Sequence, residues 1–394
     1  MNIIVPCDHH FERTPDGRVW TNGTCAYPLW TRYLAVFDAV RVVARIRDVP
    51  ELAPHRQPAD GPGVAFHAVP DFVGPRQFLS RAPRVLAAIR AAFHGGEAVI
   101  LRAGLIGDFV ERSVRRRHQP YGVEVVADPW DTFSPGAFRH PLRGYFRQRS
   151  AQKLRRQCAQ ACAVAYVTEH ALQRRYPPAA GAFATFYSDV ELSETAFAPA
   201  PRCYSAGTTR RLVYVGTLAQ LYKAPEVLID AVATGRRDGL DIELVLIGSG
   251  RYQNELAARA SAHGLNGSVQ FRGQLATPAA VREELDRANL FVLPSRQEGL
   301  PRAMVEAMAR ALPCIGSTVG GIPELLPAED MMPPGDVPAL AAKIREVITD
   351  PARLARMSAR NLAKAREYAP EVLAARREPF YRYVREQTEA WWKR

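Results

Sequence analysis

The sequence lacks the features that would mark a membrane-spanning, secreted or metal-binding protein. No apolar stretch in its 394 residues approaches the ~20 residues of a membrane-spanning helix. Six cysteines are scattered, and no further Cys or His completes a zinc set, so we expect reduced cysteines and no metal site. Residues 1–6 have no basic start before their short apolar run, so we expect a first β-strand and not a signal peptide. The cytoplasm is the expected compartment.

The charge balance is positive, with 52 Lys and Arg against 40 Asp and Glu and a net charge of +12. The densest basic segments are residues 115–118 and 143–156. No aromatic-interleaved basic motif accompanies them, so we expect no nucleic-acid partner. Two interpretations remain open. One is a solvated, arginine-rich face, and the other is attraction to anionic substrates or to a membrane surface, with peripheral membrane contact through the basic N-terminal half.

Strand-like and helix-like segments alternate along most of the chain, which predicts an α/β fold with parallel sheets and helices on both faces. Residues 49–63 are rich in Pro and Gly and predict a loop. Helices are expected at 76–93 and 142–161. The strands predicted in the first half are 2–6, 39–46, 64–69, 98–102, 123–127, 163–167 and 182–187.

A second series of the same kind begins after residues 197–209, which have the composition of a linker. Its predicted strands are 211–215, 242–247, 269–271, 290–293 and 313–315, and its predicted helices are 225–233, 252–263, 278–287 and 303–311. We therefore predict an N-terminal domain (1–200) and a C-terminal domain (201–370), each Rossmann-like and doubly wound, facing one another across a cleft. A last helix (371–394) is expected to pack back on the first domain, with Trp391 and Trp392 as anchors.

Two glutamates mark one junction of the second half as a candidate binding site. Glu298 follows an apolar run, residues 289–294, and Glu306 lies in the helix that comes next. In an open parallel sheet, ligands bind at the carboxyl edge of the strands. The start of a helix presents free N–H groups that suit an anion. A phosphate with hydroxyl groups on either side of it, as in a nucleotide sugar, fits this arrangement.

Four further strand ends carry small or polar residues that suit the close approach of a ligand. Lys223 stands before a predicted helix, where the helix dipole is already positive, so an anion between them would relieve the repulsion. A plain surface lysine is the alternative for this residue taken alone. The other candidates, each open to interpretation as a tight turn, are Gly216, Gly248, Ser249, Gly273 and the Gly-Gly-Ile-Pro-Glu segment that ends at Glu324.

These residues resemble glycosyltransferase family 4, the retaining nucleotide-sugar transferases of the GT-B fold, over about residues 210–370. The resemblance rests on the E-x7-E element, Pro-Ser-Arg-Gln-Glu-Gly-Leu-Pro from Pro294 and the Gly-Gly-Ile-Pro-Glu segment. It implies that Lys223 pairs with the donor diphosphate, that Glu298 contacts the transferred sugar and that Glu306 accepts hydrogen bonds from the ribose. Further implied donor-site positions are Gly216, Thr217, Gly248, Ser249, Arg272, Gly273, Leu300, Pro301 and Arg302.

The chain departs from the family pattern at two places. Thr217 stands where many members have an arginine, so one cation for the diphosphate is lost unless Arg296 or Arg302 substitutes for it. In the first half, Asp128 most nearly matches a catalytic His-Asp pair, although the histidine is absent and a helix cap is the alternative. Gly23 and Thr24 match the family's Gly-rich loop. His9 and His10, which follow the first strand, are further candidates for the cleft, with polar-loop or cap roles as the alternative. Stacking on a sugar or an aglycone is a further interpretation, with simple packing as the alternative, for five aromatic residues of the first half: Trp20, Trp30, Tyr121, Trp130 and Phe133.

The resemblance implies a retaining hexosyltransferase that moves a sugar, with UDP as the expected carrier, to a hydroxyl of a glycan, a lipid-linked or a small-molecule acceptor. Bacterial polysaccharide or natural-product glycosylation is the implied setting. No Asp-x-Asp triplet lies at a strand end, so we expect no metal and no cofactor beyond the nucleotide-sugar co-substrate. The alternatives are a nucleotide-sugar epimerase or hydrolase on the same scaffold and a non-catalytic nucleotide-sugar-binding protein.

Overall fold

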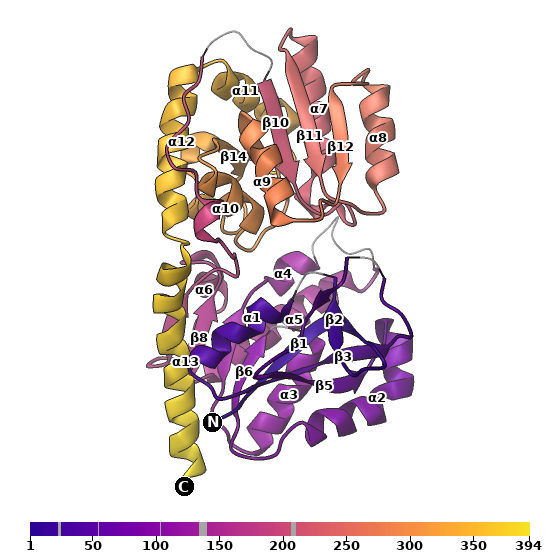
Figure 1. Cartoon of the computed structure of the whole chain (residues 1–394), viewed down its shortest axis with the longest axis vertical. Helices are drawn as coiled ribbons and strands as arrows, with labels where there is room; N and C mark the ends of the chain where they lie inside the picture. Colours follow the sequence, from indigo (N-terminus) through magenta and orange to yellow (C-terminus); the bar gives the residue numbers. More distant parts are fainter. Residues whose placement is uncertain (23–24, 54, 103, 134–139, 206–209) are drawn as a thin grey trace.

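The computed structural model describes residues 1–22, 25–53, 55–102, 104–133, 140–205 and 210–394. Two doubly wound α/β units are stacked along the long axis, and one long C-terminal helix runs beside the first of them (Figure 1). The predicted fold class is therefore confirmed. Within the described residues, no helix is both long and apolar enough to cross a bilayer.

The first sheet contains all seven strands predicted for the N-terminal half, and they pair in parallel in the order β5-β3-β1-β6-β7-β8-β9. Most of these strands are apolar runs with few charges, as expected of strands that are covered on both faces. Their bounds are β1 (Ile3–Arg13), β3 (Val40–Asp48), β5 (Val64–Pro70), β6 (Ala98–Arg102), β7 (Gly122–Val125), β8 (Ala163–Tyr166) and β9 (Phe183–Phe186).

One edge of the first unit differs from the prediction. The first strand does not end at residue 6, because a bulge between Cys7 and His10 lets β1 continue to Arg13. Beyond the bulge, β2 (Val19–Thr21) pairs with it in antiparallel fashion, and β4 (Gln57–Pro58), in the segment predicted as a loop, pairs with β2. Short turns and polar residues gave these two strands no periodic signal.

The crossover helices of the first unit cover its two faces. Those with eight or more residues are α2 (Gly74–Ala91), α3 (Leu105–Arg116) and α5 (Arg143–Gln160). The shorter ones are α1 (Tyr27–Thr31), α4 (Pro129–Thr132) and α6 (Ala171–Arg175), with 3₁₀ turns at Arg32–Ala35 and Glu194–Ala196.

The second sheet is parallel throughout, in the order β12-β11-β10-β13-β14-β15. Its chain winds outward from β10 to β12 and then returns to the other side of β10, so the strand order reverses between β10 and β13. A crevice forms at such a reversal, because the loops after the two strands diverge. The strands are β10 (Arg210–Val215), β11 (Ile242–Ile247), β12 (Val269–Gly273), β13 (Leu290–Leu293), β14 (Cys314–Ser317) and β15 (Met331–Met332).

The helices of the second unit follow the predicted segments closely and continue into a helical tail. They are α7 (Pro225–Arg237), α8 (Gln253–Ala262), α9 (Pro278–Arg287), α10 (Arg302–Ala309), α11 (Val337–Ile348), α12 (Pro351–Arg366) and α13 (Pro370–Trp392). Three 3₁₀ turns lie at Leu221–Lys223, Ile322–Glu324 and Ala328–Asp330.

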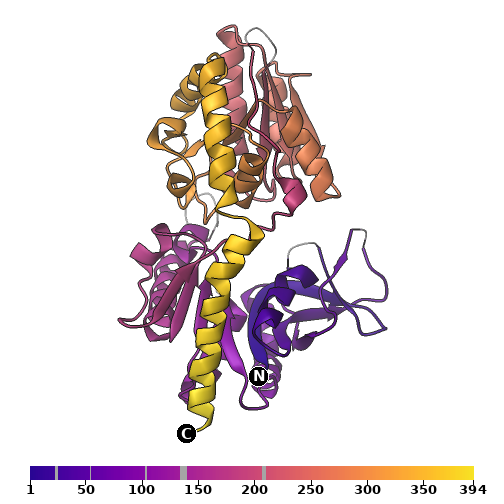
Figure 2. The ribbon, with the colours of Figure 1, turned by 60° about the vertical axis from the view of Figure 1, so that its left-hand side comes forward.

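The last helix, α13, returns to the first unit and contacts β6, β8 and β9 (Figures 1 and 2). Its Tyr381 is fully buried, stacks on Tyr33 and donates a hydrogen bond to Glu124 at 3.1 Å. Burial opposes ionisation of Glu124, but the guanidinium groups of Arg102 and Arg32 hold its pKa below the usual range. The contact of α13 with the first unit thus includes a buried charged cluster as well as apolar packing.

Candidate active site at the reversal of the second sheet

The loops that follow β10 and β13 meet at the point where the strand order reverses. There the Lys223 ammonium donates a hydrogen bond to Glu298 Oε1 at 2.7 Å, and the Ser295 hydroxyl donates to the same oxygen at 2.8 Å. Both members of the ion pair are largely buried, with Lys223 15% and Glu298 7% exposed. These two predicted residues therefore lie at the reversal of strand order, which is where ligands bind in open parallel sheets.

Backbone contacts hold the two loops in register. The Arg296 N–H donates to the Tyr222 carbonyl at 2.7 Å, which fixes the loop after β13 against the residue before Lys223. Gly216 makes room for the lysine stem, since a Cβ at this position would lie 2.7 Å from Lys223 Cδ. Gly216 was predicted to leave room for a ligand, and in the structure the side chain of Lys223 occupies that room.

Two glycines allow neighbouring loops to touch at backbone distance. Gly248 has a φ of +138°, and a Cβ there would lie 1.9 Å from the Gly216 carbonyl oxygen. Gly320 has a φ of +54°, and its Cβ would lie 1.9 Å from the Glu298 carbonyl oxygen. Only glycine tolerates such contacts, so these residues set how closely the strand ends pack around Lys223 and Glu298.

The start of α10 supplies the predicted anion-binding amides. Leu300 and Pro301 are buried, Pro301 caps the helix without a side-chain hydrogen bond, and the first turn holds no acidic residue. Arg302, the first helical residue, is exposed. Four residues later, half-buried Glu306 has its pKa raised by burial, an effect that the positive charges of Arg302 and Arg282 partly offset.

The remaining predicted donor residues lie at the ends of β10, β11 and β12, and each of them has a hydrogen-bond partner within the second unit. Thr217 Oγ1 accepts from the Ala219 N–H at 3.1 Å, and the Gly273 carbonyl accepts from the Gly248 N–H at 2.8 Å. The Ser249 hydroxyl donates weakly to Gln274 at 3.4 Å. Arg272 bonds to buried Glu284 at 2.6 Å, so its guanidinium is already paired.

Asp128 lies at the carboxyl edge of the first sheet, but its carboxylate is already engaged. It caps α4 by accepting the Trp130 N–H at 2.8 Å, and it also accepts from Tyr176 and Arg175. These contacts are those of the alternative interpretation, a helix cap. Gly23 and Thr24, the other N-terminal candidates, lie outside the described residues.

The two units contact each other through a residue whose role the sequence did not predict. Glu324 accepts hydrogen bonds from the backbone N–H groups of Glu169, His170 and Ala171 at 2.6, 3.0 and 2.8 Å. These amides follow β8 and begin α6 in the other unit. The carboxyl edge of the first sheet therefore faces that of the second, with the Lys223–Glu298 pair at the boundary.

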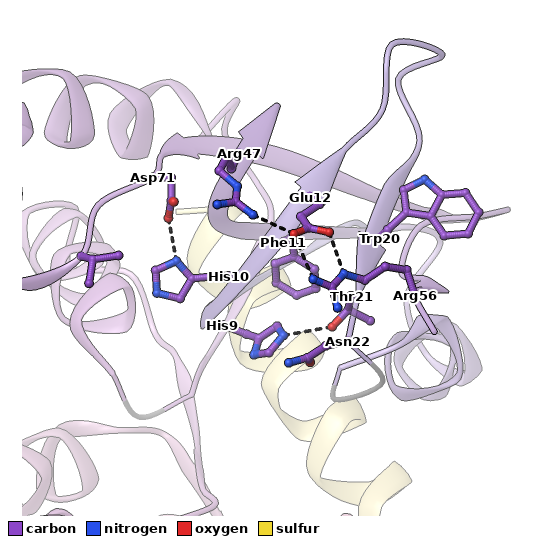
Figure 3. Close-up of a pocket in the computed structure, with 11 residues that line it drawn as sticks. His9, His10, Phe11, Glu12, Trp20, Thr21, Asn22, Arg47, Arg56 and Asp71 are labelled. Carbon is purple, nitrogen blue, oxygen red and sulfur yellow. Dashed lines mark hydrogen bonds and ion pairs between the residues drawn. The ribbon is translucent and has the colours of Figure 1, made fainter. Parts of the chain in front are cut away.

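A cavity of about 340 Å³ opens beside the extended end of β1 (Figure 3). In it, His10 Nδ1 lies 2.6 Å from Asp71, and His9 Nε2 lies 2.9 Å from the Thr21 hydroxyl. Burial and the neighbouring His10 lower the pKa of His9, which favours its neutral form. The other lining residues are Phe11, Glu12, Trp20, Asn22, Arg47, Arg56 and Val73.

The charged side chains in this cavity neutralise one another. Arg56 binds Glu12 through two nitrogens at 2.6 and 3.1 Å, and Arg47 binds the same carboxylate at 2.8 Å. With Asp71, the cavity holds two carboxylates and two guanidinium groups. Its volume falls at the lower end of the ~300–1,000 Å³ typical of small-molecule pockets.

Several of the known proteins with similar sequences are glycosyltransferases by name. Residues 209–350 match the family described as "Glycosyl transferases group 1". Protein CapJ of Staphylococcus aureus is 23% identical over 82% of this chain and 81% of its own length. A GDP-mannose-dependent monoacylated phosphatidylinositol monomannoside mannosyltransferase of Corynebacterium glutamicum is 29% identical over 58% of this chain, which spans 64% of that relative.

Solved structures show the same fold over nearly the whole chain. Sucrose-phosphate synthase from Thermosynechococcus elongatus superposes with a TM-score of 0.67 at 20% identity, covering 97% of this chain and 98% of that one. Anabaena HepE in complex with UDP and glucose gives 0.66 at 16% identity, covering 96% and 98%. The architecture is GT-B. Together with the sequence relatives, it supports a glycosyltransferase that uses a nucleotide sugar.

Proposed function

We propose that the protein is a retaining glycosyltransferase that moves a hexose from a UDP-sugar to a hydroxyl group of an acceptor. The observation that carries this proposal is the Lys223–Glu298 ion pair, placed where the second sheet reverses and beside the open start of α10. Glycosyl transfer releases negative charge on a phosphate. A fixed ammonium and free amides aimed at that charge are the arrangement that lowers such a barrier most.

Each residue of this site has a chemical role in the proposed reaction. Lys223 and the first amides of α10 neutralise the departing diphosphate. The hydrogen bonds that the described residues make to Glu298 all reach Oε1, so Oε2 is the oxygen available to a hydroxyl of the transferred sugar. Glu306, one turn into α10, accepts hydrogen bonds from the ribose. Arg302 supplies the second cation that Thr217 does not.

Retention is proposed to proceed by attack on the same face as the leaving group. Double displacement would require a carboxylate placed to attack the anomeric carbon. Asp128, the nearest candidate in the first unit, is held by three donors, which supports the single-face route. The departing phosphate then takes the proton of the acceptor hydroxyl. We propose that no metal ion is needed, so chelation with EDTA should leave turnover unchanged.

The donor base is proposed to be uracil, in line with the HepE complexes with UDP, although the Corynebacterium relative uses GDP-mannose. Thermal-shift measurements against UDP-, GDP-, ADP- and dTDP-sugars test this choice. UDP-sugars should give the largest rise in melting temperature. A larger rise with a GDP-sugar would reassign the base without changing the rest of the proposal.

The acceptor is proposed to enter from the first unit and to place a neutral, hydroxyl-rich group in the cavity beside β1. Paired charges leave that cavity without a net charge, and Trp20 among its lining residues is an aromatic ring of the kind on which sugars stack. Such an acceptor fits polysaccharide assembly in the cytoplasm.

Two other functions are separated from transfer by simple assays. An epimerase or hydrolase would convert the donor when no acceptor is present, and a binding protein would convert nothing. Incubation of the preferred donor alone, followed by incubation with a panel of glycan and lipid-linked acceptors, distinguishes all three outcomes by mass spectrometry. A transfer product is expected only in the incubation that contains an acceptor.

A further inference from the structure

Two of the long helices of the first unit carry an unusually one-sided charge. Helix α2 has four arginines and no acidic residue in its 18 positions. Helix α5, also of 18 residues, has five arginines, one lysine and no acidic residue. The two helices together carry ten positive side chains and no carboxylate, so neither helix can balance its own charge.

The topology places both helices, with α3 between them, on one face of the first sheet. Right-handed crossovers from β5 to β6, β6 to β7 and β7 to β8 all advance in the same direction along the sheet, so α2, α3 and α5 cover the same face. Contacts agree with this order, since Phe78 of α2 stacks on Phe109 of α3, and Lys153 of α5 bonds to Asp108 of α3. Helix α13 contacts Tyr33 in the opposite crossover, on the other face.

The acidic residues of α3 do not offset this charge at the surface. Asp108 is paired with Lys153 at 2.6 Å. Glu111 is 1% exposed, accepts from Gln157 and lies 3.8 and 3.7 Å from Arg115 and Arg156, so among the described residues the two carboxylates of α3 engage only these three cations. By contrast, Arg76, Arg84 and Arg149 are exposed, and none of them forms an ion pair with a carboxylate of the described residues. A basic surface therefore remains along α2, α3 and α5.

Large apolar side chains stand among these arginines. Val73 before α2 and Leu79 within it are 67% and 72% exposed, and Leu142 and Tyr145 at the start of α5 are 57% and 56% exposed. Each helix begins at the carboxyl edge of the preceding strand, which is the edge that faces the second unit through Glu324. Exposed apolar groups among cations are the combination that inserts into the headgroup region of a lipid surface.

We propose that α2, α3 and α5 dock the protein on an anionic phospholipid bilayer, with Val73, Leu79, Leu142 and Tyr145 inserted and the arginines on the headgroup phosphates. The docking surface begins at the carboxyl edge of the first sheet, the edge that contacts the second unit through Glu324. It follows, resting on the transferase function proposed above, that the acceptor hydroxyl is presented by a lipid-linked molecule in that bilayer.

Vesicle sedimentation tests the docking without any sugar chemistry. The whole chain is mixed with vesicles of phosphatidylcholine alone and with vesicles in which about one-third of the lipid is phosphatidylglycerol, at physiological salt. Binding to the second kind only is expected. The variant R76Q/R84Q/R149Q should bind the anionic vesicles roughly 100-fold more weakly, since three surface cations are lost. L79S should also weaken binding without changing the melting temperature.

The matched control is R356Q/R382Q, which removes two exposed arginines from α12 and from the opposite face of the first unit. It should bind as the unaltered chain does. The proposal is overturned if the triple variant binds anionic vesicles as well as the unaltered chain does. It is also overturned if the control variant loses as much binding as the triple variant, or if the chain binds duplex DNA and not vesicles. If vesicles bind but no acceptor is ever glycosylated, the docking holds and the transferase function fails, so the two are separable.

Discussion

Lys223 is held in position by contacts within the protein itself. Its ammonium bonds to Glu298, its stem fills the space that Gly216 leaves, and Tyr222 is tied to the loop after β13. Ordering a lysine side chain on binding would otherwise cost rotamer entropy. Folding already orders this side chain. Such preorganisation makes a charged side chain effective in stabilising a leaving group.

Replacement of Lys223 by alanine should therefore lower turnover by roughly 10²-fold or more at saturating donor. Steady-state kinetics with a labelled UDP-sugar measure this change. Lys343→Ala is a suitable control, because Lys343 makes an ion pair of the same 2.7 Å length with Glu346 on α11. Unchanged turnover in Lys223→Ala would remove the assigned role.

Glu306 should make donor affinity depend on pH in the acidic range. Burial raises the pKa of its carboxyl above the usual 4.5, and only the ionised form accepts hydrogen bonds through both oxygens. Affinity for UDP should therefore fall as the pH falls through this raised pKa. Calorimetry over a pH series should show the decline in the natural chain and a weaker, flat response in Glu306→Gln. The same pH dependence in both would contradict the role.

His10 tests whether the cavity beside β1 binds the acceptor. His10→Ala removes a polar group that faces the cavity, so the KM for the acceptor should rise by roughly 10-fold while kcat and donor affinity stay the same. His263→Ala is the matched control, since His263 bonds to Asp230 at 2.9 Å on the surface of α8. A rise in the donor KM, or an equal effect in the control, would show that the acceptor does not bind in this cavity.

At the scale of single elements, the short helix α6 depends on a residue of the other unit. Glu324 accepts from the N–H groups of Ala171, the first residue of α6, and of Glu169 and His170 just before it, so the contact both caps α6 and joins the two units. In Glu324→Ala, the amides of residues 169–171 should exchange with deuterium at least roughly 10-fold faster. Glu367→Ala, which breaks only a surface pair with Lys364, should not change them. Unchanged protection in Glu324→Ala would show that the units are held by other contacts.

The elements that the sequence predicted well are those with a local signal. The strand 290–293 is a buried apolar run, and the glycines after β11 and β14 stand where loops touch at backbone distance. Lys223 and Glu298, 75 residues apart, were placed together because the carboxyl edges of parallel strands converge. Such signals belong to short segments or to general rules of topology.

Other features of the site depend on partners that the sequence does not reveal. Glu324 lies in a segment predicted to be part of the donor site, but its partners are backbone amides 153 to 155 residues away in another unit. Arg272 was expected in the donor site, and it is paired with Glu284. β2 pairs with the part of β1 that follows its bulge, and β4 pairs with β2. Tertiary contacts, not local propensity, decide these three cases.

At the scale of the whole molecule, two sheets present their carboxyl edges to each other. The proposed donor residues lie on the second unit, and the cavity beside β1 lies on the first. The helices of the basic face, α2, α3 and α5, begin at the carboxyl edge of the first sheet. Donor, acceptor and lipid surface are thus assigned to adjoining parts of one molecule, and each assignment rests on different residues.

The most direct measurement is a crystal structure of the protein with an intact or non-hydrolysable UDP-sugar. We expect the nucleotide at the reversal between β10 and β13, with its diphosphate beside Lys223 and the first amides of α10, its ribose at Glu306 and its sugar at Glu298. A nucleotide bound away from the β10–β13 reversal, or a diphosphate out of reach of Lys223, would contradict the proposed function.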